Sequence, residues 1–181
     1  MPFVATANLS NVLKVHKNLS ERLARFYIAL LVIGVEKLHD SGILLRNLSI
    51  TSLIIDQDGY IQLFDFGRTK QGTHSSSLNG SLPYFSPEKV ARQEYTKQAD
   101  WWSVGIIAYE LVFGFTPFFH TKKGKHEHNI INNEVTFPNK ARIGHTEYFR
   151  DFIRKLLVKN PEDRLGSKED ILRHPWFTGI P

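Results

Sequence analysis

Apolar residues recur at helical spacing through the N-terminal part of the chain. Leu9–Val15 predicts a short helix. Ser20 has a side chain suited to capping a helix, and a long helical period follows it as far as Asp40-Ser41-Gly42, where small and polar residues favour a turn. The apolar positions that set this period are Leu23, Phe26, Tyr27, Leu30, Leu31, Gly34, Val35 and Leu38.

The period changes between Ile43 and Phe66. Leu53–Ile55, a turn at Asp56–Gly59 and the run Tyr60–Leu63 predict a β-hairpin. The stretch Arg68–Gly80 is rich in Ser, Thr and Gly and has no periodicity. A loop of this length inside a compact domain is usually either functional or disordered.

The remaining pattern is helical. Trp101–Phe113 is almost wholly apolar, which predicts a helix that runs through the core. Two shorter amphipathic helices are predicted over Asp151–Leu157 and Lys168–His174. With no internal repeat and no Gly/Ser linker, residues 1–181 are predicted to form one domain, mainly α with a small β-hairpin.

Composition narrows the functional class. The 181 residues are 41% hydrophobic, enough for a core, and contain neither an apolar run long enough to cross a membrane nor an export signal. The chain has no cysteine, which fits a reducing compartment, and we expect a cytoplasmic or nuclear protein. Its net charge of +5 is scattered and forms no basic face with stacking aromatics, so we expect no nucleic-acid partner and no membrane partner.

Three histidines lie close together in the sequence. His120, His126 and His128, with Glu127, could suggest a metal site. The surrounding glycine and lysine residues favour a solvated loop between helices instead. His39, at the end of the long helix, is expected to be packed rather than reactive.

Three short motifs follow one another along the chain: Asp65-Phe66-Gly67, Ser86-Pro87-Glu88 and Asp100-Trp101-Trp102. In this order, after a helix and a hairpin, they resemble the C-terminal lobe of a protein kinase. Leu19-Ser20-Glu21 and Gly59-Tyr60-Ile61-Gln62 are similar to the cyclic-AMP-dependent type within the AGC group. The similarity covers nearly the whole chain and implies a protein-kinase-like C-lobe.

The resemblance divides the chain into parts. It implies a hinge at residues 1–7, a catalytic loop at 44–56, an activation segment at 65–88 and lower helices at 100–181. Because the chain begins at the position of the hinge, we expect it to lack the N-lobe with its glycine-rich loop and strand lysine. ATP and magnesium are the cofactors of the family, and we expect them to bind this chain weakly or not at all.

The catalytic loop departs from the family pattern. Asn47 stands in place of the catalytic aspartate, and a neutral amide cannot accept a proton. Ser49 replaces the lysine that offsets charge on the transferred phosphoryl group. Ser52 replaces the amide ligand of magnesium, for which its hydroxyl is a shorter substitute. Together these changes are expected to extinguish useful turnover.

Other ligand-binding positions are partly retained. Asp65 keeps one oxygen ligand for magnesium, or is a turn aspartate kept for the fold; the two interpretations weigh equally. Phe66 is expected to be a core spine residue in either case. Val4, Asn8 and Ile54 are the other candidate nucleotide-binding residues, with Ile54 in the floor under the adenine. An ordinary hydrophobic hairpin would have the same sequence pattern around Ile54.

The polar stretch carries a candidate regulatory site. By resemblance, Ser77 corresponds to the phosphorylated threonine of the family's activation segment, and Arg46 is the matching cation. The favoured alternative is that Ser75-Ser76-Ser77 is a flexible solvated run. Arg46 is expected to keep a structural role beside Asp100 either way.

The substrate subsites are eroded while the framework is kept. The family's acidic subsites for arginine-containing peptides correspond to Asn8, Thr51 and Glu110, with another near Pro83, and only Glu110 is acidic. Ser81 corresponds to a threonine that contacts the catalytic aspartate and lysine. Glu88 and Arg164 correspond to the family's buried ion pair.

Three functions follow as hypotheses. The first is a pseudokinase or partial kinase of the serine/threonine type that acts by binding proteins, with a regulatory-subunit-like protein among the candidate partners. The second is an active serine/threonine kinase whose N-lobe is missing from this sequence. The third is a non-functional fragment with an exposed apolar surface.

Overall fold

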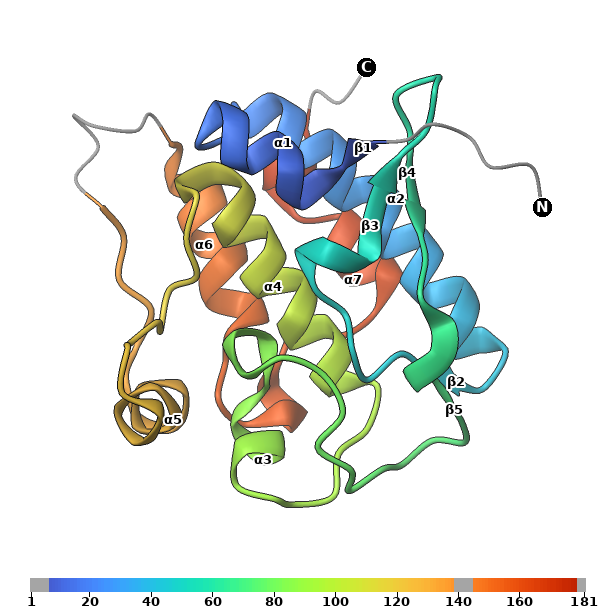
Figure 1. Ribbon diagram of the computed structural model, residues 1–181, viewed down its shortest axis with the longest axis vertical. Helices are drawn as coiled ribbons and strands as arrows, with labels where there is room; N and C mark the ends of the chain where they lie inside the picture. The colour runs from blue at the N-terminus through green and yellow to red at the C-terminus, as the bar shows by residue number, and fades with distance from the viewer. Residues whose placement is uncertain (1–6, 139–144, 179–181) are drawn as a thin grey trace.

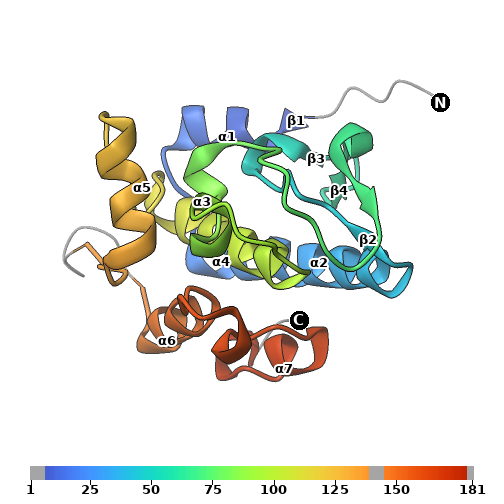
Figure 2. The same ribbon diagram turned by 90° about the horizontal axis from the view of Figure 1, so that it is seen from below.

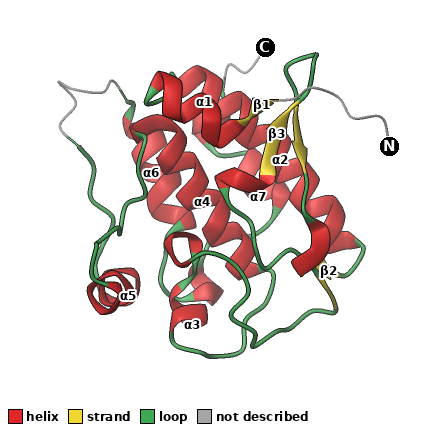
Figure 3. Ribbon diagram, viewed as in Figure 1, coloured by secondary structure: helices red, strands yellow, loops and turns green. Residues whose placement is uncertain are grey.

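The computed structural model describes residues 7–138 and 145–178. Helices make up most of the molecule and short strands lie along one side (Figure 3). The helices are α1 (Leu9–His16), α2 (Glu21–Asp40), α3 (Pro87–Val90), α4 (Gln98–Phe113), α5 (Lys123–Asn132), α6 (Glu147–Leu156) and α7 (Lys168–Leu172). The strands are β1 (Ala7–Asn8), β2 (Ile43–Leu44), β3 (Leu53–Ile55), β4 (Ile61–Leu63) and β5 (Lys70–Gln71). Single 3₁₀ turns include η1 (Ile50–Ser52), η2 (Phe66–Arg68) and η3 (Leu82–Tyr84).

Helix α4 is the centre of the core. It packs against α2 on one side and α6 on the other, and α7 lies against α2 (Figures 1 and 2). Every residue of α4 except Gln98 and Glu110 is buried, as the apolar sequence predicted. The helix ends at Gly114, whose φ of 82° is favourable only without a side chain. This mostly apolar helix is stable here because α2, α6 and the η3 turn pack against it.

Local signals in the sequence correctly located α2. The Ser20 hydroxyl accepts a hydrogen bond from the Leu23 amide and caps the helix. Gly42, with φ of 70°, turns the chain after the last helical residues. The predicted long helix is therefore confirmed at both ends.

The predicted hairpin is formed by β3 and β4, with Ile54 opposite Gln62. Strand β1 adds a third strand, with Asn8 opposite Ile54. The Asp56 carboxylate accepts hydrogen bonds from the amides of Asp58 and Tyr60 and closes the turn. The fold class is mainly helical with a small antiparallel sheet, as the sequence predicted.

Some predicted boundaries were wrong. Helix α6 begins at Glu147, because Thr146 caps it and Phe149 belongs to its buried face. Helix α4 begins at Gln98, before its apolar run. Helix α7 ends at Leu172.

The histidine-rich segment was predicted to be a solvated loop, and this was wrong. It forms α5, which packs against α3, with His126 and Ile130 buried on one helical face. Burial lowers the pKa of His126. In the described ranges, no three acidic or histidine side chains gather closely enough to hold a metal ion.

No helix within residues 7–138 and 145–178 combines the length and the apolar character that crossing a bilayer requires.

Candidate functional site

The loop between β2 and η1 is held by one buried carboxylate. Asp100 accepts hydrogen bonds from the backbone amides of Leu45 and Arg46, each over 3.0 Å. The imidazole of His39, which is packed as expected, donates to the same carboxylate over 2.9 Å. Arg46 has a φ of 62°, an unusual value for a non-glycine residue. Asp100 therefore fixes a strained loop, and Arg46 has the expected structural place beside it.

Ser49 and Ser52 make hydrogen bonds within their own loop. The Ser52 hydroxyl accepts from the Ser49 amide over 3.1 Å and donates to the Ser49 carbonyl over 2.7 Å, and both residues are buried. The Ser49 hydroxyl shares a hydrogen bond of 2.8 Å with that of Thr51. These contacts give Ser52 a local structural role, and its expected role as a magnesium ligand stays a prediction.

Asn47 is half-buried where its own loop meets the activation segment. A Cβ atom on Gly80 would lie 3.1 Å from the Asn47 side-chain oxygen and 3.0 Å from the Arg46 carbonyl. Gly80 also has a φ of 112°. The close approach of these two segments therefore requires glycine, and it places the Asn47 amide at their junction.

The candidate nucleotide and metal residues lie farther along the hairpin. Asp65 is exposed with φ of 67°, just after β4. Ile54 is half-buried in the sheet. The Asn8 side chain accepts from the Ser10 amide and donates to the Thr51 carbonyl, so it caps α1 and ties it to η1. Val4 lies outside the described residues.

Phe66 is not a core residue, contrary to the prediction. Its side chain is 48% exposed, because η2 follows β4 on an open face of the molecule and no described segment covers the ring. Motif matching could not detect this difference, since burial depends on neighbours in space.

The donor set gives a direct test of the expected magnesium–nucleotide site. Asp65 offers one carboxylate, whereas magnesium prefers several oxygen ligands at octahedral positions. The Ser52 hydroxyl already donates and accepts within its own loop. The described residues therefore do not fit a complete magnesium–nucleotide site.

Arg46 and Ser77 are brought together by the fold. The Arg46 guanidinium donates to the Ser77 hydroxyl over 2.9 Å and to the carbonyls of Arg68 and Thr69 over 2.7 and 3.0 Å. Ser75 is only 3% exposed, and its backbone pairs with Tyr95. This part of the chain is therefore not the solvated run that the sequence favoured. Phosphorylation of Ser77 stays a prediction.

Sequence reasoning missed Lys89. Its ammonium is buried and donates to the backbone carbonyl of Arg46 over 2.5 Å and to that of Asn79. It also lies over the rings of Phe85 and Tyr95. Burial lowers its pKa to about 8. A lysine next to the Ser-Pro-Glu motif carries no sequence signal of burial, because lysine is usually a surface residue.

The framework ion pair forms as expected. Arg164 donates to both carboxylate oxygens of Glu88 over 2.8 and 3.0 Å, and both side chains are buried. Arg164 also donates to the carbonyls of Val158, Gln98 and Lys159. The pair therefore ties the end of the activation segment to the lower helices.

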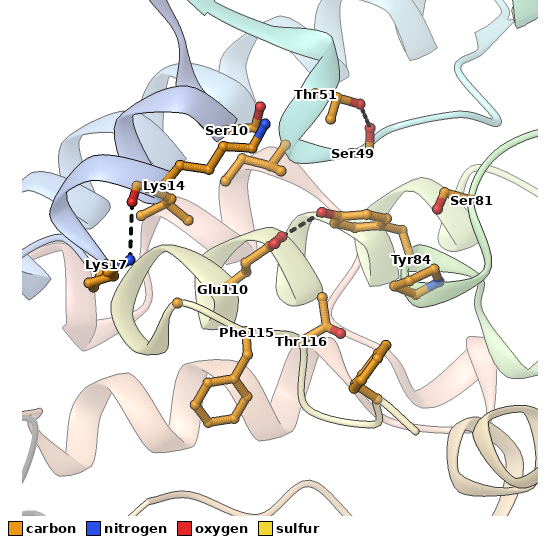
Figure 4. A pocket seen from close by; sticks show the side chains of 15 residues that line it. Ser10, Lys14, Lys17, Ser49, Thr51, Ser81, Tyr84, Glu110, Phe115 and Thr116 are labelled. Carbon is orange, nitrogen blue, oxygen red and sulfur yellow. Dashed lines mark hydrogen bonds between the residues drawn. The ribbon is translucent and has the colours of Figure 1, made fainter. Parts of the chain in front are cut away.

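A cleft of about 660 Å³ opens between α1, η1 and η3. Figure 4 shows the Glu110 carboxylate facing the Tyr84 hydroxyl on the cleft floor. The hydroxyl donates to the carboxylate over 2.5 Å. Burial raises the pKa of both groups. Ser81, whose expected catalytic partners are replaced, lies exposed at the edge of the same cleft.

Comparison with known proteins gives a consistent result. A family model of the protein kinase domain matches residues 1–177. The cAMP-dependent protein kinase type 3 of Saccharomyces cerevisiae is 32% identical over 185 residues, which cover 99% of this chain and 46% of that protein.

Plant and animal proteins are similar too. The serine/threonine-protein kinase AtPK1/AtPK6 of Arabidopsis thaliana is 39% identical over 88% of this chain and 35% of its own length. The serine/threonine-protein kinase N2 of Danio rerio is 34% identical over 87% of this chain and 17% of its own length. The chain thus spans less than half the length of each of these relatives.

Proposed function

This chain belongs to the protein kinase family, and on that premise we propose that it is a kinase-like module that acts by binding other proteins rather than by transferring phosphate. The resemblance to AGC-type serine/threonine kinases and the C-lobe-like fold are confirmed. The observation that carries the proposal is the catalytic loop, where the resemblance puts a neutral amide and two hydroxyls at the positions of the catalytic groups.

Phosphoryl transfer depends on charge that this loop lacks. Catalysis of this reaction is mostly positioning and electrostatic stabilisation of the transferred group. Asn47 offers no proton acceptor, and Ser49 offers no positive charge. Loss of one such group raises a barrier by about 3 kcal/mol in comparable enzymes, and several losses need not add. The Ser49 hydroxyl is hydrogen-bonded to that of Thr51.

The parts that hold the fold are retained. The Asp100 carboxylate fixes the catalytic loop, and the Glu88–Arg164 pair fixes the end of the activation segment. Breaking such a buried pair is strongly destabilising. An intact framework around an altered loop supports a role in which the surface of the module, rather than its chemistry, is used.

Two observations favour the alternative of an active serine/threonine kinase. Asp65 is exposed and available as a metal ligand, and the activation segment is already ordered around Arg46. If a longer protein supplied the remaining nucleotide-binding groups, this half could take part in transfer. We infer that Mg-ATP binds this chain weakly or not at all.

A transfer assay tests the proposal. The chain is incubated with radiolabelled ATP, magnesium and a mixed library of serine- and threonine-containing peptides, with Asp65→Ala as the matched control. We expect the same background incorporation from both proteins. Steady magnesium-dependent phosphorylation that disappears in Asp65→Ala would overturn the proposal and establish the alternative.

Nucleotide binding is measured separately by thermal unfolding with and without Mg-ATP. A ligand stabilises a folded protein in proportion to the logarithm of its concentration over its Kd. We expect a melting temperature unchanged within error. A rise of several degrees that is absent in Asp65→Ala would show that the nucleotide site is functional.

A further inference from the structure

The cleft beside the altered loop has an unexpected charge. Thr51 and Glu110, which correspond to acidic subsites of the family, line it together with Pro83, near which another subsite was expected. Sequence comparison could place these positions along the chain but could not show that they share one cleft. Residues of α1 line it as well.

Two lysines bring positive charge to this cleft from the side of α1. Ser10 and Lys14 are four residues apart and lie on one face of the helix, and Lys17, the capping residue directly after it, lines the cleft as well. In Figure 4 the Lys14 side chain extends from α1 towards Ser10 at the rim. Lys14 and Lys17 are exposed and make no ion pair with any residue in the described part of the chain. Their ammonium groups contact only an amide oxygen and a backbone carbonyl, over 3.5 and 3.4 Å.

The wall that holds these lysines is anchored at both ends. At its start, the Asn8 side chain donates to the Thr51 carbonyl over 3.0 Å. After its end, the Leu19 amide donates to the Leu111 carbonyl over 2.7 Å. A Cβ atom on Gly114 would lie only 2.2 Å from the Lys17 carbonyl oxygen, so the two segments are in close contact. The positions of the two lysine backbones are therefore set by packing, although their side chains reach into solvent.

The one carboxylate among the described residues lining the cleft is engaged. Glu110 accepts the Tyr84 hydroxyl over 2.5 Å and is partly buried. Lys14 and Lys17 outnumber it, so the lining carries a net positive charge. The hydroxyls of Ser10, Ser81 and Thr116 line the same space and can donate to oxyanions.

We propose that this cleft binds an extended, acidic segment of a partner protein, with its carboxylate or phosphate groups on Lys14 and Lys17. The inference rests on the proposed function, because it names the kind of protein that the module binds. A volume of about 660 Å³ is within the range of ligand-binding clefts. Opposite charge across an interface selects the partner and suppresses the wrong one. A basic segment would meet two lysines instead.

Fluorescence anisotropy with three labelled peptides tests this inference. The first alternates glutamate with alanine, the second carries phosphoserine at the central acidic positions, and the third replaces every glutamate by arginine. We expect binding of the acidic peptides, weakened by added salt, and no binding of the arginine peptide. The ratio between the first two affinities distinguishes carboxylate from phosphate as the preferred group. Equal or tighter binding of the arginine peptide would overturn the inference.

Charge-reversed variants locate the binding. Lys14→Glu with Lys17→Glu is expected to weaken the acidic peptide at least about tenfold. Lys37→Glu with Lys125→Glu changes the net charge equally at exposed positions outside the cleft, and we expect less than about a twofold effect, because salt screens distant charges. Equal weakening by both pairs, or by neither, contradicts the proposed site. If the first pair does not fold, Lys14→Gln with Lys17→Gln replaces it, and a loss of at least about threefold is expected.

The outcome can be separated from that of the proposed function. Peptide binding is measured without nucleotide, and phosphoryl transfer is measured without reference to this cleft. A chain that transfers phosphate contradicts the proposed function even if it prefers acidic peptides. A chain that transfers none but binds the arginine peptide contradicts only this inference.

Discussion

The guanidinium of Arg46 donates a hydrogen bond to the Ser77 hydroxyl over 2.9 Å, and so joins the catalytic loop to the activation segment in the unmodified chain. Arg46 also donates to two carbonyls of the segment after β4. The cation is therefore already in place before any phosphate is added. A phosphate on Ser77 would strengthen an existing contact rather than create a new arrangement.

Phosphoserine at residue 77 is predicted to stabilise the fold. A charge-assisted hydrogen bond contributes more than a neutral one, so we expect the free energy of unfolding to rise by about 1 kcal/mol. The phosphoserine is incorporated genetically and stability is measured by urea denaturation. Phosphoserine at the exposed neighbour Ser76 is the matched control and should have little effect. An equal effect at both positions, or a gain that survives Arg46→Met, would contradict the role of Arg46.

Loss of Arg164 is predicted to cost more than loss of the charge on Glu88. Arg164→Met leaves a buried carboxylate and three backbone carbonyls without their partner, and we expect a loss of at least about 3 kcal/mol. Glu88→Gln keeps the shape and one acceptor, so its cost should be smaller. Urea denaturation of both variants checks the order. Two small and equal losses would show that the pair is not essential.

Stability is predicted to rise with pH because of Lys89. Burial lowers its folded-state pKa from 10.5 to about 8. The nearby Asp100 carboxylate raises this pKa, and the Arg46 guanidinium lowers it. Between these values the unfolded chain binds more protons than the folded one, so the free energy of unfolding increases as pH rises. Relative to Lys89→Met, the natural chain should gain about 2 kcal/mol between about pH 7 and about pH 9.5.

This pH dependence is measured as the difference between two denaturation series, so that titration of other groups cancels. Lys125→Met, at an exposed position, is the control and should show no such difference. A difference between the natural chain and Lys89→Met that stays constant with pH would mean that Lys89 keeps an ordinary pKa in the folded state.

Gly114→Ala and Gly124→Ala are predicted to have opposite effects. At Gly114 the new Cβ would lie 2.2 Å from the Lys17 carbonyl, and the φ of 82° disfavours alanine, so α1 must move and the melting temperature should fall by several degrees. Gly124 lies in α5 with open space around its Cβ position, and alanine there favours the helix by about 0.5–1 kcal/mol. A stabilising effect at Gly114 would mean that the two segments do not approach closely in solution.

Much of the fold could be predicted from the sequence because its signals are local. The cap at Ser20, the apolar period after it and the turn before Ile43 are each encoded within a few neighbouring residues. The same is true of the hairpin at Leu53–Ile55 and of the buried α4. Some helix boundaries were not predicted correctly. The start of α6 depends on Phe149, and its contact with Trp176 is not visible in the local sequence pattern.

The candidate site was predicted as positions but not as geometry. The sequence by itself predicted that Asn47 and Ser49 stand in place of charged groups, through the resemblance that the Asp-Phe-Gly and Ser-Pro-Glu motifs carry. Only the tertiary structure decided that the Lys89 ammonium is buried against the catalytic loop and that Phe66 is exposed. It also decided that Lys14 and Lys17 share a cleft with Glu110. Helices and turns follow from neighbours along the chain, whereas burial and net charge in a cleft depend on side chains that only folding brings together.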